Sequence, residues 1–452
     1  MAKQKSQKNK QKRVKPELAG GFRDCAPAGA IIKQRLLEKI KKTFEDFGFD
    51  PLETPAVERT EVLLGGERES DKIIFRVAPA ARSEVKDIKR DQLSLRFDLT
   101  VPLARFVAAN PDIPKPFKRY QVGNVWRGES PQAGRWREFT QADADIVGSS
   151  STDADCEIVC LVYQTFKNLG INNFLIKINN RKILNALPRY AGFTEKKLWE
   201  LLRLIDKKDK VGEEKTKKEI KKLLGAKAAE KIYKFLAVSG DTKTKILNAR
   251  ELLKGVPAAE GGLKEIIEIF RGLNAFRVDP KNWEIDFSTV RGLGYYTGPI
   301  FEVVLTNVPE IGSVAAGGRY DNITIPFTGQ KIPTVGISIG VDRLLAALDK
   351  IGLLKKKNTT VQALIMNLSS DLKTNYFSLA AELRNANINT EFYLGDDKAF
   401  QAQLAYAVKK EIPYVIIYGE EEQKKGVAAV KNLITREQKE IPLNGITEYF
   451  KK

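Results

Sequence analysis

The sequence predicts an α+β fold, in which an antiparallel sheet flanked by helices is interrupted by a helical insertion and followed by a C-terminal α/β domain. Two strand patterns, 117–127 and 137–147, flank a loop of turn-forming residues, which indicates an antiparallel hairpin. Residues 194–275 are lysine-rich and helical in pattern, with few β-branched residues. Beyond residue 358, strand and helix patterns alternate, which is typical of a small domain with a largely parallel sheet.

The segment before the hairpin contains one clear amphipathic helix. Residues 29–47 place apolar side chains at three- and four-residue spacing, with lysines and acidic residues between them. Gly48 ends this helix, and the two prolines of 49–55 predict an extended segment. Further along the chain, the pattern predicts a strand at 94–97 and a short helix at 99–109.

After the hairpin, strand and helix patterns continue to alternate around the lysine-rich segment. The pattern predicts a helix at 156–169, a strand at 173–178, and a break inside the lysine-rich segment at the glycines and proline of 257–262. It then predicts strands at 283–287 and 299–305, a glycine-rich turn at 317–318, and a strand and helix over 334–349. The chain thus divides into a basic disordered tail (1–16), a sheet domain in two parts (17–190 and 279–355), a helical insertion (191–278) and a C-terminal domain (356–452).

The charge balance favours a polyanionic partner without identifying one. The chain has 76 basic and 57 acidic residues, a formal charge of +19. The first sixteen residues hold seven cations and no acid, which predicts disorder. This tail could attract RNA phosphates or simply aid solubility, and the sequence favours neither.

The lengths of the apolar runs and the number of cysteines indicate where in the cell the protein is located. No apolar run approaches the roughly 18 residues that a membrane span needs, so no membrane association is expected. The three cysteines, an odd and small number, predict a reducing compartment, and we expect a cytoplasmic protein. The chain contains no histidine, which excludes Ser-His-Asp and Cys-His catalysis, histidine-ligated zinc and an imidazole base.

Arginines on or beside strand patterns form the most distinctive chemical feature. They occur in four clusters, 95–100, 126–145, 291–298 and 315–343. The members are Arg96, Arg127, Arg137, Arg291, Arg319 and Arg343, near the glycines Gly317, Gly318, Gly336 and Gly340. A guanidinium is a planar donor fork suited to phosphate, and glycines permit close approach, so the set predicts a polyphosphate site on the sheet. The alternative is that these arginines form structural ion pairs.

These clusters resemble the motifs of the class II aminoacyl-tRNA synthetases. Gly48 to Pro55 with the preceding helix resembles motif 1, Arg127 to Phe139 resembles motif 2, and Gly336 to Arg343 resembles motif 3. R-G-L-G-Y-Y at 291–296 and A-A-G-G-R-Y-D at 315–321 resemble two motifs of the histidyl-tRNA synthetases, although Gly294 stands where an aspartate is often found. The tail from about 358 is similar to the class IIa anticodon-binding domain.

The resemblance implies an ATP- and Mg²⁺-dependent enzyme that activates L-histidine and transfers it to tRNA(His). It implies a homodimer, and no metal ligand is assigned among the protein residues. The implied catalytic residues are Arg127 and Arg291. The implied ATP-binding residues are Arg127, Glu129, Arg135, Phe139 and Arg343. The implied histidine-binding residues are Asp98, Thr100, Gln141, Asp145, Arg291, Tyr295 and Tyr296, and Gln132 is implied to lie near the tRNA acceptor end.

Structural roles and other functions remain open beside this interpretation. Tyr295 and Tyr296 could pack in a core, Asp98 could cap the helix that follows it, and Asp145 could pair with Arg127 or with the arginine at 137. The nearest functional alternative is a histidine-sensing regulatory paralogue of ATP phosphoribosyltransferase, which resembles the synthetases but lacks aminoacylation activity. A threonine, proline or glycine class IIa synthetase and a non-enzymatic RNA-binding protein are further alternatives.

Overall fold

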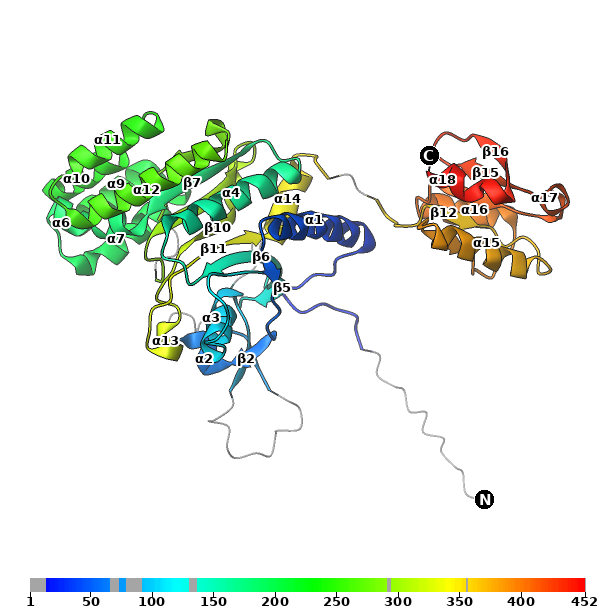
Figure 1. Cartoon of the computed structure of the whole chain (residues 1–452), viewed down its shortest axis with the longest axis horizontal. Coiled ribbons are helices and arrows are strands. Elements are labelled where there is room, and N and C mark those ends of the chain that lie inside the picture. The colour runs from blue at the N-terminus through cyan, green and yellow to red at the C-terminus, as the bar shows by residue number, and fades with distance from the viewer. Residues whose placement is uncertain are drawn as a thin grey trace, which may run out of the picture. The chain divides into compact units, whose positions relative to one another are not determined.

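The computed structural model describes residues 14–65, 73–78, 92–129, 136–290, 294–354 and 357–451. They form two compact units, of which the first consists mainly of Leu36–Leu353 and the second mainly of Leu354–Lys452 (Figure 1). Arg135, Gln132 and Arg291, three of the predicted site residues, lie outside the described residues. Within the described ranges, no helix is both long and apolar enough to cross a membrane.

An eight-stranded sheet forms the centre of the first unit, and the predicted α+β class is confirmed. The hairpin is antiparallel as predicted. The six central strands pair with one another in antiparallel fashion, while each edge strand pairs in parallel with its neighbour. In spatial order the strands are β1 (Asp50–Pro51), β5 (Phe117–Trp126), β6 (Glu138–Val147), β11 (Thr334–Gly340), β10 (Ser313–Arg319), β9 (Pro299–Leu305), β7 (Phe174–Asn180) and β8 (Trp283–Ile285).

The prediction of a glycine-rich turn at 317–318 is wrong, because both glycines lie inside β10. Each is paired on both sides, with β9 and with β11. A Cβ atom at Gly317 would lie 2.1 Å from the carbonyl oxygen of Gly336. These glycines therefore allow neighbouring strands to approach closely, rather than turning the chain.

Alternate residues of the central strands give the sheet one apolar face, which helices cover. Ala142, Ala144 and Ile146 of β6 are buried on this face beside alternate residues of β11. Helices α1 (Pro27–Asp46) and α4 (Thr152–Asn168) lie over this face (Figure 1). The α1 helix contributes Phe44, whose ring centroid lies 5.8 Å from that of Tyr120 on β5.

Helix α4 begins at Thr152, earlier than the predicted start at residue 156. The reason is a local cap, because the hydroxyl of Ser151 accepts a hydrogen bond from the backbone N–H of Asp153 at 3.1 Å. The capping residue therefore lies before the first apolar residues that the periodicity detects.

The lysine-rich segment is helical, as predicted, but without the predicted break at 257–262. Pro257 instead starts α12, where its fixed φ angle suits the first turn. Gly262 lies within that helix, and a Cβ there would come within 2.8 Å of Ile183. The glycine thus permits close helix packing. The helices of this region are α5 (Arg181–Asn185), α6 (Leu187–Ala191), α7 (Leu198–Asp206), α8 (Lys208–Val211), α9 (Glu213–Leu224), α10 (Ala226–Leu236), α11 (Thr242–Leu252) and α12 (Pro257–Ala275).

Smaller elements surround the remaining edge of the sheet domain. A three-stranded sheet has the order β2 (Val57–Arg59), β4 (Leu93–Leu95) and β3 (Arg76–Val77). The helices are α2 (Thr60–Leu64), α3 (Thr100–Ala109), α13 (Ile325–Thr328) and α14 (Val341–Lys350), and α14 follows β11 directly.

The C-terminal unit is an α/β domain whose sheet is mixed rather than largely parallel. Strand β12 is parallel to both of its neighbours, but β15 and β16 form an antiparallel extension that the sequence did not predict. The strands in order are β13 (Thr390–Phe392), β12 (Ala363–Ile365), β14 (Tyr414–Ile417), β15 (Val427–Asn432) and β16 (Gln438–Pro442). The helices are α15 (Lys373–Asn385), α16 (Phe400–Lys409), α17 (Glu420–Lys425) and α18 (Ile446–Lys451).

Candidate active site

The second face of the large sheet is polar and carries most of the predicted site residues that the structure describes. Gln141, Asp143 and Asp145 alternate along β6 and therefore point to this face together. Asp145 lies between Arg119 of β5 and Gly336 of β11 in the strand register. Arg119 and Asp145 thus lie side by side on neighbouring strands in the middle of the sheet.

Asp145 is held by two residues that the sequence did not single out. Its Oδ2 lies 2.6 Å from Nη2 of Arg119, which is fully buried. Its Oδ1 accepts a hydrogen bond from the hydroxyl of Tyr320, which follows β10. A Cβ at Gly336 would lie 1.8 Å from the same Oδ1, so the glycine leaves the space for this carboxylate. The sequence-based alternative, in which Asp145 pairs with Arg127 or with the arginine at 137, is therefore wrong.

Asp143 is a second buried carboxyl group on the same face, and it was also missed. Its side chain is 2 % exposed, and its Oδ1 has no hydrogen-bond partner among the described residues. Burial and the neighbouring charge of Asp145 raise the pKa of Asp143 to about 7, against the opposing effects of Arg119 and of a hydrogen bond from Ser338. The alternation Q-A-D-A-D at 141–145 was the available signal, because it places both carboxylates on one strand face.

Asp98 and Gln141 lie at this face, and both make structural contacts. Asp98 Oδ1 accepts a hydrogen bond from the backbone N–H of Val101 at 3.1 Å, so it caps the start of α3 as the structural alternative proposed. Burial raises the pKa of Asp98 to about 6, while Arg127 and Arg119 oppose the shift. The amide of Gln141 donates to the hydroxyl of Ser338, and Thr100 is the first residue of α3.

The predicted ATP-binding residues lie at the far end of the same strands. The guanidinium carbon of Arg127 lies 5.1 Å from the ring centroid of Phe139, and its Nε donates to the carbonyl of Phe97 at 3.1 Å. Glu129 is exposed beyond the end of β5. Arg343, in the first turn of α14, donates to the carbonyl of Ser313 at 2.7 Å. The structure thus brings Arg127 and Phe139 into direct contact.

Three tyrosines border the carboxylates. The ring centroids of Tyr295 and Tyr296 are 4.4 Å apart, and that of Tyr320 lies 6.1 Å and 6.5 Å from them, respectively. The hydroxyl of Tyr295 donates to that of Tyr296 at 3.3 Å. Tyr295 is 43 % exposed, so it is not a core residue, and the core-packing alternative fails for it.

Two of the arginines expected to bind phosphate have structural roles instead. Arg96 donates to the carbonyl of Thr54 at 2.6 Å and to that of Asn124 at 2.9 Å. A Cβ at Gly123 would lie 2.4 Å from Arg96 Nη2, so that glycine admits a guanidinium of the protein itself. Arg319 forms a buried ion pair with Asp155 on the apolar face. In each case the arginine satisfies buried protein groups.

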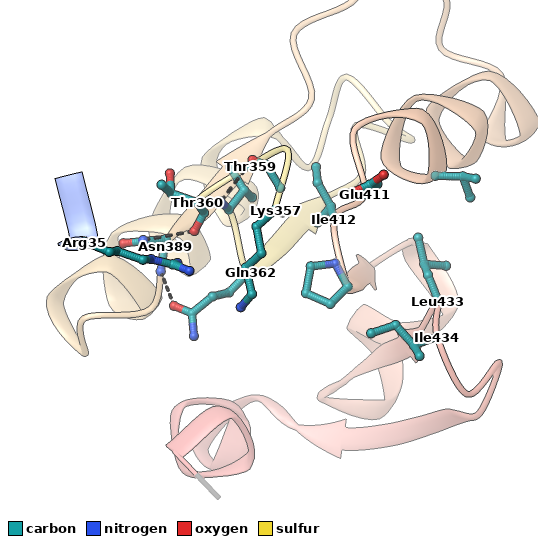
Figure 2. Close-up of a pocket in the computed structure, with 13 residues that line it drawn as sticks. Arg35, Lys357, Thr359, Thr360, Gln362, Asn389, Glu411, Ile412, Leu433 and Ile434 are labelled. Carbon is teal, nitrogen blue, oxygen red and sulfur yellow. Dashed lines mark hydrogen bonds between the residues drawn. The ribbon is translucent and has the colours of Figure 1, made fainter. Parts of the chain in front are cut away.

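A separate cavity lies in the C-terminal unit and contains none of the predicted site residues. Its volume is about 570 Å³. Its walls include the amides Gln362 and Asn389 and the aliphatic side chains Ile412 and Leu433 (Figure 2). Asn389 donates through its side chain to the carbonyl of Thr360 at 3.0 Å. Its lining also includes the charged side chains Arg35, Lys357 and Glu411.

The central antiparallel sheet with its polar face, and the C-terminal α/β domain, both match models of known protein families. The family model of histidyl-tRNA synthetase matches residues 21–344, and that of an anticodon binding domain matches residues 362–452. The chain therefore belongs to the histidyl-tRNA synthetase family.

Individual relatives agree with this assignment over nearly the whole chain. A histidine–tRNA ligase of Clostridium tetani is 40 % identical, over 97 % of this chain and 98 % of its own length. The crystal structure of histidyl-tRNA synthetase from Nostoc sp. PCC 7120 matches with a TM-score of 0.87 and 31 % identity, covering 97 % of this chain and 99 % of that one. A structure described as an ATP phosphoribosyltransferase regulatory subunit/histidyl-tRNA synthetase from Bacillus halodurans C matches with a TM-score of 0.73 and 23 % identity, covering 87 % and 97 %. That likeness shows the fold alone.

Proposed function

We propose that the polar face of the sheet activates L-histidine with ATP and then transfers it to the 3′ end of tRNA(His). The observation that carries this proposal is the group formed by Asp143, Asp145, Arg119 and the nearby tyrosines. Buried acceptors and hydroxyl donors on one strand face suit a ligand that has both a ring N–H and a ring nitrogen acceptor. A pocket that bonds both nitrogens strongly rejects amino acids that lack them.

The two ends of the amino acid are assigned to different residues. Asp98, Thr100 and Gln141 are proposed to hold the α-ammonium group, because they combine a carboxylate with two neutral acceptors. Asp145 and Tyr296 are proposed to read the imidazole ring, with Tyr295 beside them. Asp145 also forms an ion pair with Arg119 and accepts a hydrogen bond from Tyr320, so the ring would meet a carboxylate whose position is already fixed.

The ATP end of the site is proposed to use positioning and charge rather than an enzyme nucleophile. Arg127 and Arg291 would contact the α-phosphate from opposite sides while the histidine carboxylate attacks the phosphorus and pyrophosphate leaves. Phe139 would stack on the adenine and Glu129 would bond its amino group. Arg135 and Arg343 would reach the terminal phosphates. Because no step needs an imidazole of the enzyme, a chain without histidine can perform this chemistry.

Mg²⁺ is proposed to enter with ATP. The described residues contain no group of three or more histidine, cysteine, aspartate or glutamate side chains that could hold a metal ion by themselves. A magnesium ion in a nucleotide site is usually held largely by phosphate oxygens and water. When bound, the ion offsets phosphate charge.

The remaining partners follow from the match of each part of the chain. Residues 362–452 match an anticodon binding domain, which favours a tRNA ligase over the regulatory alternative. Gln132 is proposed to lie near the tRNA acceptor end. A homodimer through the motif 1 region is proposed from the class, and a cytoplasmic location is supported by the three unpaired cysteines, Cys25, Cys156 and Cys160.

Pyrophosphate exchange tests the proposal. Purified protein with ATP, Mg²⁺ and labelled pyrophosphate should incorporate label into ATP only when L-histidine is added. Equal exchange with other amino acids, or no exchange with histidine, would eliminate the assignment.

A further inference from the structure

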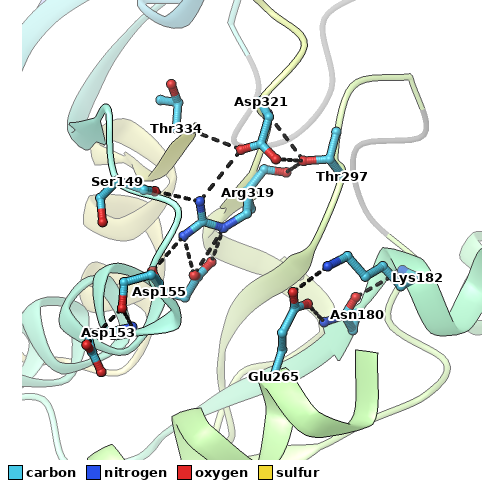
Figure 3. A network of polar contacts seen from close by, with 11 residues as sticks. Ser149, Asp153, Asp155, Asn180, Lys182, Glu265, Thr297, Arg319, Asp321 and Thr334 are labelled. Carbon is cyan, nitrogen blue, oxygen red and sulfur yellow. Dashed lines mark hydrogen bonds and ion pairs between the residues drawn. The ribbon is translucent and has the colours of Figure 1, made fainter. Parts of the chain in front are cut away.

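Residues adjacent in sequence to two of the pocket tyrosines form a polar network of their own, whose side chains contact one another rather than the carboxylates of the polar face. Thr297 directly follows Tyr296, while Arg319 and Asp321 flank Tyr320. Figure 3 shows Thr297, Arg319, Asp321 and Asp155 joined by one set of contacts. None of these four residues has a proposed contact with substrate.

Arg319 anchors the network to helix α4. Its Nε lies 3.1 Å from each carboxylate oxygen of Asp155, and its Nη2 lies 2.5 Å from Oδ2. The same guanidinium donates to the carbonyls of Ser149 at 2.8 Å and Ser151 at 3.0 Å. Both ionic side chains are almost fully buried. A guanidinium held by a bidentate carboxylate and two carbonyls has little freedom to move, so the end of β10 is fixed against α4.

Thr297 and Asp321 lock the tyrosine loop to that anchor. The hydroxyl of Thr297 donates to Oδ2 of Asp321 at 3.0 Å and accepts from the backbone N–H of Asp321 at 3.2 Å. The backbone N–H of Thr297 donates to the carbonyl of Arg319 at 2.7 Å. Asp321 Oδ1 in turn accepts from the backbone N–H of Thr334 on β11 at 3.1 Å. The side chain of Asp321 therefore connects the segment at Thr297 with the start of β11 at Thr334.

The network also sets the space in which the tyrosine rings pack. A Cβ at Gly318 would lie 3.1 Å from ring atoms of Tyr296, and a Cβ at Gly298 would lie 3.0 Å from Cδ of Arg319. The Tyr296 ring thus packs closely on the backbone of β10 at Gly318, and the Arg319 side chain packs closely on the backbone at Gly298. A shift of Thr297 away from Asp321 would move Tyr296 relative to Tyr320 and its carboxylate partner Asp145.

We infer that Thr297 and Asp321, held by the Arg319–Asp155 pair, are positioning residues for histidine recognition. They hold the loop that carries Tyr296 in a fixed position relative to Tyr320. The inference rests on the proposed function for the identity of the ligand. The anchoring of the loop is a property of the protein alone and is testable without a ligand.

The test compares Thr297→Val with Thr297→Ser. Valine keeps the shape and removes the hydroxyl, whereas serine keeps it. Thr165→Val is the matched control, because Thr165 is buried in α4, away from the tyrosine loop in sequence, and its hydroxyl donates to the carbonyl of Leu161 at 2.7 Å. The valine variant should raise the KM for histidine in pyrophosphate exchange roughly tenfold, the usual effect of one lost hydrogen bond, with an unchanged KM for ATP. The serine variant should recover the wild-type KM, and Asp321→Asn should shift KM in the same direction as the valine variant.

Amide hydrogen exchange of residues 294–298, measured without ligands, gives the independent readout. It should be faster in Thr297→Val than in the wild type, Thr297→Ser and Thr165→Val. Wild-type exchange rates in the valine variant, or a lower kcat with an unchanged KM for histidine, would overturn the inference. If the wild-type enzyme shows no histidine-dependent pyrophosphate exchange, the proposed function fails, while the amide measurement still decides whether the loop is anchored in this way.

Discussion

Nη2 of Arg119 lies 2.6 Å from Oδ2 of Asp145, and both side chains are buried in the middle of the large sheet. Asp143 stands two positions away on the same strand face, with one oxygen that lacks a partner among the described residues. One buried cation therefore faces two buried carboxyl groups. The site therefore keeps a hydrogen-bond acceptor, the same oxygen of Asp143, that a ring N–H could use.

Removing the cation of this pair should destabilise the sheet domain. Arg119→Met leaves the carboxylate of Asp145 buried without its partner, and we expect the unfolding free energy to fall by about 3 kcal/mol. Urea unfolding followed by tryptophan fluorescence measures this change. The double variant Arg119→Met/Asp145→Asn should recover part of the loss, because no charge is then left uncompensated. A single variant as stable as the wild type would show that the pair is not an important buried interaction.

Asp143 should make stability depend on pH near neutrality. Its pKa is raised from 3.8 to about 7, so the folded state keeps a proton that the unfolded state has lost. The unfolding free energy should therefore fall as pH rises from about 4 to about 7, by at most about 1.4 kcal/mol per pH unit. Asp98 and Asp155, whose pKa values are raised to about 6, contribute in the same direction at lower pH.

Asp143 contributes the largest share of the decline between pH 6 and pH 7, because Asp98 and Asp155 are already about half ionised at pH 6 and ionise further above it. Asp143→Asn should flatten the decline in that interval, whereas the same change at the exposed Asp112 should leave it. Denaturant unfolding at half-unit pH steps measures both. An undiminished slope in Asp143→Asn would contradict the assignment of the titrating group.

Gly336 should be required for histidine recognition, because its missing side chain accommodates Asp145. In Gly336→Ala the new Cβ would lie 1.8 Å from Asp145 Oδ1 and 2.9 Å from the carbonyl of Ala144. We expect a loss of about 1–3 kcal/mol in stability and a roughly 100-fold lower kcat/KM for histidine, since the carboxylate must move. Gly340→Ala on the same strand is the control, because its Cβ would meet nothing closer than 3.6 Å. Equal effects of both changes would show that Asp145 does not specifically need the space left by Gly336.

The two proposed phosphate arginines should act on the chemical step. Arg127→Ala and Arg291→Ala should each lower kcat for pyrophosphate exchange by about 100- to 1000-fold, because each removes a donor aimed at charge that develops in the transition state. The exposed Arg250, which pairs with Glu260 in the insertion, provides the control substitution. Circular dichroism should show the fold intact in all three variants. Near-normal kcat in Arg291→Ala would mean that Arg291 is not the residue that contacts the α-phosphate opposite Arg127.

Much of the sheet domain could be predicted from local patterns. The α1 helix has one strong apolar stripe, and β5 and β6 are long strands around a loop of turn-forming residues, so periodicity alone identifies them. Gln141 and Asp145 were predicted because they lie in the cluster 126–145, whose resemblance to the family implies their roles. Errors arose where one residue type has two uses. Gly317 and Gly318 serve close strand packing rather than a turn, and Pro257 starts a helix rather than breaking one.

The missed site residues depend on partners in other strands. Arg119 meets Asp145 only because β5 and β6 pair in one particular register, and a shift of one residue would place the arginine on the apolar face. Tyr320 reaches Asp145 across β11, where Gly336 leaves the space. Neither relationship is visible in a single sequence, because each depends on the order of strands in space rather than along the chain.

A crystal structure of the enzyme with bound L-histidine tests the central claim most directly. We predict that the imidazole ring lies over β6, with one ring nitrogen within hydrogen-bond distance of the Asp143–Asp145 carboxyl groups and the other within reach of the Tyr296 hydroxyl. The α-ammonium group should lie toward Asp98 and Gln141. Histidine bound away from the polar face of the sheet, or a ring that contacts neither carboxyl group, would contradict the account.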